Sequence, residues 1–128
     1  MISETSQKFL RAVAGTLPAD RVVEVHLFPA RRQGHAETGV AVLAVAPPEG
    51  AAEERHAVYT ARYRLLIKGP DRGRWEFDCK PEADAPLVTV ETVVRGAMER
   101  AGDVGEPERF DSAAWRAALD DAAWVTPA

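Results

Sequence analysis

Cysteine is nearly missing from this chain of 128 residues, which contains only Cys79. One cysteine excludes an internal disulfide and any zinc site built from several thiolates. The three histidines, His26, His35 and His56, do not stand at a spacing typical of metal ligands, with one another or with carboxylates. We therefore expect no metal and no cofactor, and we predict that Cys79 packs in the core as an apolar residue.

Long hydrophobic runs are also missing. The longest apolar run covers Val40 to Pro48 and is too short to span a bilayer. The first fifteen residues, MISETSQKFLRAVAG, have neither a basic leader nor a sustained apolar stretch, so they do not resemble a signal peptide. We expect a protein without membrane contacts, located in the cytoplasm.

A basic surplus is missing as well. Lysine and arginine total 16 against 20 acidic residues, the net charge is −4, and the only basic run is Arg31-Arg32. This balance argues against binding nucleic acid by bulk electrostatics. With 46% apolar and 28% charged residues, the composition is that of a globular protein. We predict a single domain over residues 1–128.

Sequence motifs of catalysis are not found either. The chain has no GxGxxG after a strand, no GxxxxGK[ST], no HExxH and no GxSxG. The weak candidate for chemistry is the pair Glu24 and His26, which lie two residues apart on a predicted strand and so share one face. An enzyme that uses this pair, with Arg62 and Arg64 to hold an acidic substrate, is our third-ranked hypothesis.

The most regular stretch that is present runs from His56 to Lys80 and predicts a long β-hairpin. Apolar and polar residues alternate along both arms, which is typical of half-buried strands. The loop Gly69 to Gly73, GPDRG, joins the arms with residues that favour turns. The predicted buried side carries Tyr59, Ala61, Tyr63, Leu65, Ile67, Trp75, Phe77 and Cys79. We interpret the charged side as a solvated ladder of ion pairs in preference to a binding surface.

The register of this hairpin also follows from the pattern. A slip of one residue would turn every side chain to the other face. Pairing Ile67 with Trp75 keeps the apolar faces together, and it places Leu65 opposite Phe77 and Tyr63 opposite Cys79. In the same register Arg64 lies opposite Asp78.

The residues before the hairpin predict one helix and two strands. Ser3 to Leu17 has apolar residues at helical spacing, with Ser3 as N-cap and Leu17-Pro18 as its end. Arg21 to Phe28 and Thr38 to Ala46 are the strands, and Gly34 is the tip of the loop between them. The second strand is apolar on both faces, so it should lie centrally or be covered on both sides.

The residues after the hairpin predict two helices. The first runs from Leu87 to Ala101, with Asp84 as candidate cap and Gly102 at its end; a short strand at Leu87 to Val90 is the alternative. Residues 102–109 look like a linker. Asp111 caps the last helix, in which Phe110 and Trp115 form a hydrophobic staple.

These elements predict an α+β fold with the order α-β-β-β-β-α-α. We expect a four-stranded antiparallel meander with the N- and C-terminal helices packed on one face. The opposite face would be mixed, and a second subunit could cover it. It would carry Val22, Glu24, His26, Phe28, Thr60, Arg62, Arg64 and Leu66.

Two further hypotheses on function rank above the enzyme. The first is a non-enzymatic homodimer that acts as an adaptor; its weak interface candidates are His26, Phe28, Arg62, Arg64 and Trp124, an indole that lies off the predicted helix stripe. The second is a small-molecule cup between the sheet and the helix beginning near Leu87. Its weak ligand-binding candidates are Tyr59, Tyr63, Trp75 and Phe77.

Overall fold

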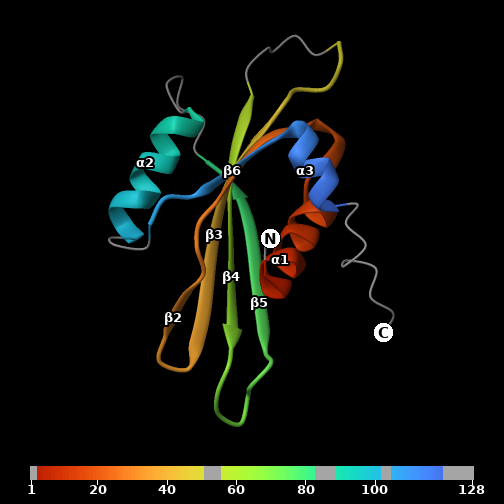
Figure 1. Ribbon diagram of the computed structural model, residues 1–128. Coiled ribbons are helices and arrows are strands. Elements are labelled where there is room, and N and C mark those ends of the chain that lie inside the picture. The colour runs from red at the N-terminus through yellow and green to blue at the C-terminus, as the bar shows by residue number, and fades with distance from the viewer. Residues whose placement is uncertain (1–2, 51–55, 83–88, 102–104, 120–128) are drawn as a thin grey trace.

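One antiparallel sheet of six strands lies between two layers of helices (Figure 1). The computed structural model describes residues 3–50, 56–82, 89–101 and 105–119. The strand order is β5-β4-β3-β1-β6. Strand β2 pairs with the first residues of β3, which lie beyond the part of β3 that pairs with β1. In chain order the elements are α1 (Glu4–Thr16), a 3-10 turn (Ala19–Arg21), β1 (Val22–Leu27), β2 (Arg31–Gln33), β3 (Ala36–Val45), β4 (Ala57–Leu66), β5 (Trp75–Pro81), α2 (Val90–Ala101), β6 (Glu108–Asp111) and α3 (Ser112–Leu119).

Helices α1 and α3 cover one face of the sheet and bury the main core there. Helix α1 begins where Ser3 accepts a hydrogen bond from the backbone N–H of Ser6, and it ends before Pro18, as the sequence predicts. The ring of Phe9 packs against Tyr63 and Phe77, with centroid distances of 4.7 and 6.0 Å. The core on this face contains Phe9, Leu10, Val13, Leu17, Val22, Val25, Leu27, Ala41, Leu43, Val45, Ala61, Tyr63, Phe110 and Trp115.

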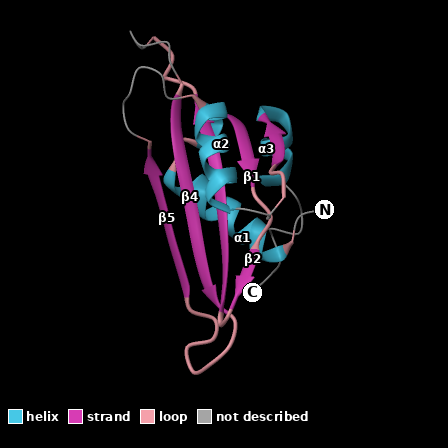
Figure 2. Cartoon of the chain, turned by 90° about the vertical axis from the view of Figure 1, so that its left-hand side faces the viewer, coloured by secondary structure: helices cyan, strands magenta, loops and turns pink. Residues whose placement is uncertain are grey.

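Helix α2 lies on the opposite face and builds a second, smaller core. That core contains Phe28, Val42, Ala44, Val58, Val90, Val94 and Ala97. In Figure 2, α2 lies in front of the sheet, whereas β5, at the left of that view, has no helix in front of it. Helices α1 and α3 thus share one face as expected, whereas α2, which we also expected on that face, covers part of the face that we expected to be open.

The α+β class and the antiparallel sheet are confirmed, with six strands in place of the four predicted. Strand β6 occupies the end of the segment that we interpreted as a linker and pairs with β1. It was missed because its four residues contain one apolar side chain, Phe110. Strand β2 was missed because all three of its residues are exposed and carry no alternating pattern.

The predicted hairpin register is wrong by two residues. Leu65 pairs with Trp75, Tyr63 with Phe77, and Arg64 with Glu76. The cause is an earlier closure of the hairpin: the N–H of Leu66 donates to Arg74 O at 3.0 Å and Leu66 O accepts from the N–H of Gly73 at 2.7 Å, so Ile67 belongs to the loop. A shift of two keeps every side chain on its face, which is why the predicted buried side is still correct.

A β-bulge near the start of β1 changes the predicted facing of two valines. The pairing with β3 shifts between Val22 and Glu24. As a result Val22 lies in the main core and Val23 packs against the second core, the reverse of the simple alternation. Beyond the bulge, Glu24 and His26 share the face opposite α1 as predicted, and α2 lies on that same face.

Hydrogen bonds at their first turns fix the starts of the two later helices. Thr89 Oγ1 accepts from the N–H of Thr92 at 3.2 Å, so α2 begins at Val90. The predicted cap Asp84 lies outside the described residues, as do Leu87 and Gly102. A strand from Leu87 to Val90 was the alternative; of its described residues, Thr89 precedes the helix and Val90 is the first residue of α2. The predicted cap Asp111 is confirmed, since its Oδ1 accepts from the N–H of Ala114 at 2.8 Å.

Candidate functional site

A pocket of about 290 Å³ lies on the α2 face, between the C-terminal half of α2 and the sheet. It is formed where the end of β1, strands β2, β3 and β4, and helix α2 meet. Its size is at the lower end of the range for small-molecule sites. The lining residues are Phe28, Pro29, Arg31, Thr38, Gly39, Val40, Arg62, Ala97 and Arg100.

One side of the pocket is apolar and packed against the second core. Phe28 is 5% exposed and Ala97 is 7% exposed, and both belong to the second core. The N–H of Phe28 donates to Val40 O at 3.0 Å, which ties the end of β1 to β3 at this point. Packing and this hydrogen bond therefore hold the Phe28 and Ala97 side of the pocket in place.

Gly39 contributes backbone to the pocket and has the ring of Tyr63 directly behind it. A Cβ built at Gly39 would lie 2.1 Å from Tyr63 Cε1. Tyr63 belongs to the opposite face and is 3% exposed. Only glycine at this position lets the Tyr63 ring pack against the backbone of β3. At Gly39, therefore, only the backbone of β3 separates the pocket from the Tyr63 ring.

Three arginines from three separate elements reach the pocket: Arg31 from β2, Arg62 from β4 and Arg100 from the last turn of α2. Within the described part of the chain, no carboxylate forms an ion pair with Arg62 or Arg100. The C-terminal carbonyls of α2 disfavour an anion by about 0.3–1 kcal/mol. The full positive charges of Arg62 and Arg100 alone outweigh that partial negative charge, so the pocket is electropositive in a protein whose net charge is −4.

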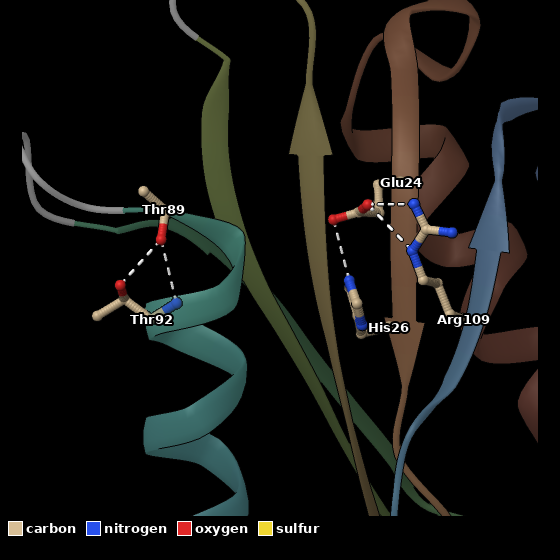
Figure 3. Close-up of polar contacts among 5 residues, drawn as sticks. All are labelled: Glu24, His26, Thr89, Thr92 and Arg109. Carbon is tan, nitrogen blue, oxygen red and sulfur yellow. Dashed lines mark hydrogen bonds and ion pairs between the residues drawn. The ribbon is translucent and has the colours of Figure 1, made fainter.

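A second polar group on this face links β1 to β6 (Figure 3). Glu24 Oε1 accepts from Arg109 Nη2 at 2.6 Å and from Arg109 Nε at 3.1 Å, and Glu24 Oε2 lies 3.0 Å from His26 Nε2. Partial burial alone would raise the pKa of Glu24, but the hydrogen bonds and charges of His26 and Arg109 together lower it below its usual value. The same contacts raise the pKa of Arg109.

The predicted closeness of Glu24 and His26 is thus present, and Arg109 is a partner that the sequence did not indicate. Arg109 was missed because strand β6, which carries it, was missed. The carboxylate of Glu24 contacts both His26 and Arg109. Its bond to Arg109 joins β1 to β6, which is a structural role. Neither Glu24 nor His26 lines the pocket, so the pocket does not support the hypothesis of an enzyme that uses this pair.

The four aromatic residues predicted to line a cup lie on the other face, against α1. Tyr63 stacks on Trp75 at a centroid distance of 4.9 Å, and its hydroxyl donates to Glu37 Oε2 at 3.0 Å. Burial, with the Glu37 charge and hydrogen bond adding to it, raises the pKa of Tyr63. Tyr59, Trp75 and Phe77 pack against the main core, and none of the four lines the pocket. A ligand at these four residues stays a prediction.

The predicted interface residues are distributed over the α2 face. Phe28 is buried under α2 and His26 is partly buried, whereas Arg62 and Arg64 are exposed. Phe28 and Arg62 meet at the pocket, and Arg64 Nη1 lies 4.0 Å from Glu76 Oε1. Trp124 lies outside the described residues.

Cys79 packs against the main core on the α1 face, and burial raises its pKa to about 11. The described residues contain no group of three or more histidine, cysteine or acidic side chains placed to hold a metal ion. In the same part of the chain, no helix has the length and apolar character needed to cross a membrane. Comparison of the chain with protein-family models, with curated proteins and with solved structures found no match.

Proposed function

We propose that this protein binds a small organic anion in the pocket between α2 and the sheet. The observation that carries the proposal is the meeting of Arg31, Arg62 and Arg100 at one apolar-walled pocket. Guanidinium groups bind carboxylate and phosphate through paired N–H donors, and they do so best where the surroundings are partly dry. The site corresponds to the cup hypothesis in its place beside α2, with different lining residues.

The chemistry of the lining favours binding over turnover. Of the nine lining residues, Thr38 alone carries a hydroxyl, and none is a histidine, cysteine or carboxylate. The pocket therefore offers no general base to activate a nucleophile. The ligand is a carboxylate or phosphate with an apolar part that fits against Phe28 and Ala97.

The net charge of the protein bears on the class of ligand. A net charge of −4 repels nucleic acid outside the pocket, so the partner is a small anion and not a polynucleotide. A cytoplasmic location stays part of this proposal.

Titration calorimetry with phenyl phosphate and benzoate as probes tests the proposal. Both anions should bind, and uncharged benzyl alcohol should bind more weakly. Arg62→Gln should weaken binding of phenyl phosphate roughly 10-fold or more, since charged hydrogen bonds contribute about 1.5–3 kcal/mol each. Arg100→Gln should have a similar effect.

Matched controls come from the same two elements. Arg64→Gln removes an arginine two residues along β4, and Arg95→Gln removes one from α2; both residues are exposed and neither lines the pocket. Each control should bind phenyl phosphate as the wild type does. Failure of both anions to bind, or an equal loss in Arg62→Gln and Arg64→Gln, would overturn the proposal.

A further inference from the structure

Strand β5 forms one edge of the sheet, with β4 on one side and no described strand on the other. Arg74 O accepts from Leu66 N–H, and Glu82 N–H donates to Val58 O, so residues 74 and 82 direct their backbone groups toward β4. In an antiparallel ladder this direction alternates from residue to residue. The backbone groups of Trp75, Phe77 and Cys79 therefore point outward, and no described strand pairs with this row of donors and acceptors.

The side chains along this edge divide by face. Trp75, Phe77 and Cys79 lie on the α1 face and are each partly exposed at the border of the main core. Glu76, Asp78 and Lys80 are exposed on the other face. An edge with half-exposed apolar residues and free backbone donors is a template for another strand.

We propose that a second copy of this chain pairs its own β5 with this edge, antiparallel, about a two-fold axis at Asp78. Outward residues must then face outward residues, and Phe77 lies opposite the partner's Cys79. On the charged face Glu76 lies opposite the partner's Lys80, and the reverse pair follows from the symmetry. The pairing continues the sheet across both subunits and covers the apolar residues of the edge.

The charge pattern selects this register over its neighbours. An axis at Phe77 would set Glu76 opposite the partner's Asp78 and Arg74 opposite the partner's Lys80, which are like charges. An axis at Cys79 would set Asp78 opposite the partner's Lys80, which is favourable, but it would set Glu76 opposite the partner's Glu82, so its two attractive pairs are offset by two repulsive ones. An axis at Asp78 gives four opposite-charge pairs, Glu76 with Lys80 and Arg74 with Glu82, each twice, against one Asp78 pair on the axis. Arg62 is the β4 neighbour of Asp78.

The opposite edge of the sheet is a weaker candidate. Strand β6 has four residues against seven in β5, so it offers fewer outward donors. The chain also turns directly from β6 into α3, which begins at Ser112. The inference does not depend on the anion pocket, because none of the outward-facing edge residues lines that pocket.

Sedimentation equilibrium of the full chain is the first test. The wild type should show a concentration-dependent mass that approaches twice that of the monomer. Lys80→Glu should weaken the dimer roughly 10-fold or more, because two attractive cross-strand pairs become repulsive. Asp78→Asn should strengthen the dimer by removing the acidic pair on the axis. Lys68→Glu, the same charge change in the exposed hairpin loop, should leave the dimer unchanged.

Disulfide trapping tests the register directly. In a Cys79→Ser background, Asp78→Cys should give a cross-linked dimer under mild oxidation, because non-hydrogen-bonded partners lie about 4.5 Å apart between Cα atoms. Lys80→Cys in the same background should not cross-link, because the two copies of that position lie four residues apart along the strand. A wild type that stays monomeric at every concentration, or equal cross-linking of both variants, would overturn the proposal.

Discussion

Gly39 is the residue where the two faces of the sheet depend most directly on each other. Its backbone lines the pocket, and the ring of Tyr63 lies behind it. Tyr63 is held in turn by stacking on Trp75 and by its hydrogen bond to Glu37. These contacts hold the Tyr63 ring in its position against Gly39.

Replacing Gly39 by alanine should destabilise the fold. The added Cβ would lie 2.1 Å from a ring atom that is buried and hydrogen-bonded, and such overpacking costs roughly 1–3 kcal/mol. Gly15→Ala is the matched control, because nothing lies within 4 Å of a Cβ at that helical position. The control should raise the free energy of unfolding by about 0.4–1 kcal/mol. Urea unfolding of both variants measures the effect; equal stability of Gly39→Ala and wild type would contradict it.

Glu24 should make stability fall in acid. Its pKa in the folded protein is lowered, so its carboxylate adds stability that is present above the unfolded value, about 4.5, and lost as the pH falls through the folded value. Glu24→Gln should therefore be less stable than wild type at neutral pH, with a difference that shrinks in acid. Glu99→Gln, at an exposed position on α2, should show no such trend. A pH-independent difference for Glu24→Gln, measured by urea unfolding at several pH values, would contradict this reasoning.

Among the elements, α3 and β6 form one unit that closes the main core. Trp115 is fully buried and donates from Nε1 to Ala19 O at 3.0 Å, and Phe110 belongs to the same core. The sequence predicted the cap, the staple pair and the buried tryptophan, because each depends on residues close together in the chain. It did not predict that Glu108 to Asp111 pairs with β1, because that contact joins segments more than eighty residues apart.

The cap of α3 gives the prediction for this unit. Asp111→Ala removes the acceptor of the Ala114 N–H and should lower the free energy of unfolding by about 0.5–2 kcal/mol. Glu108→Ala, an acidic and exposed residue of the same strand, is the control and should change little. Chemical unfolding monitored by tryptophan fluorescence measures both. An equal loss in the two variants would show that charge, and not the cap, is responsible.

In the whole molecule, the decisive feature is that helices cover both faces of the sheet. The sequence held a signal for this arrangement: residues 38–46 are apolar on both faces, which predicts cover from both sides, and they form the central strand β3. It did not indicate which helix covers which face, because the α2 stripe of Val90, Val94 and Ala97 fits either one. The pocket depends on that placement, so its lining could not be predicted.

Local patterns therefore predicted the helices, four of the six strands and most of their buried sides, while the site depends on contacts between distant segments. Arg62 was singled out in the sequence as part of a charged face. Its meeting with Arg31 and Arg100 requires the α2 placement and the short β2 strand together.

The most direct measurement is a titration of the full chain with phenyl phosphate, followed through the backbone amide chemical shifts. The proposed site predicts saturable shifts at Thr38, Gly39 and Ala97, which surround the pocket, and no shifts at Val13 in the core beneath α1. Arg62→Gln should reduce the shifts at a given concentration of phenyl phosphate. Shifts confined to the α1 face, or no saturable shift at the pocket, would contradict the assignment of this pocket to an organic anion.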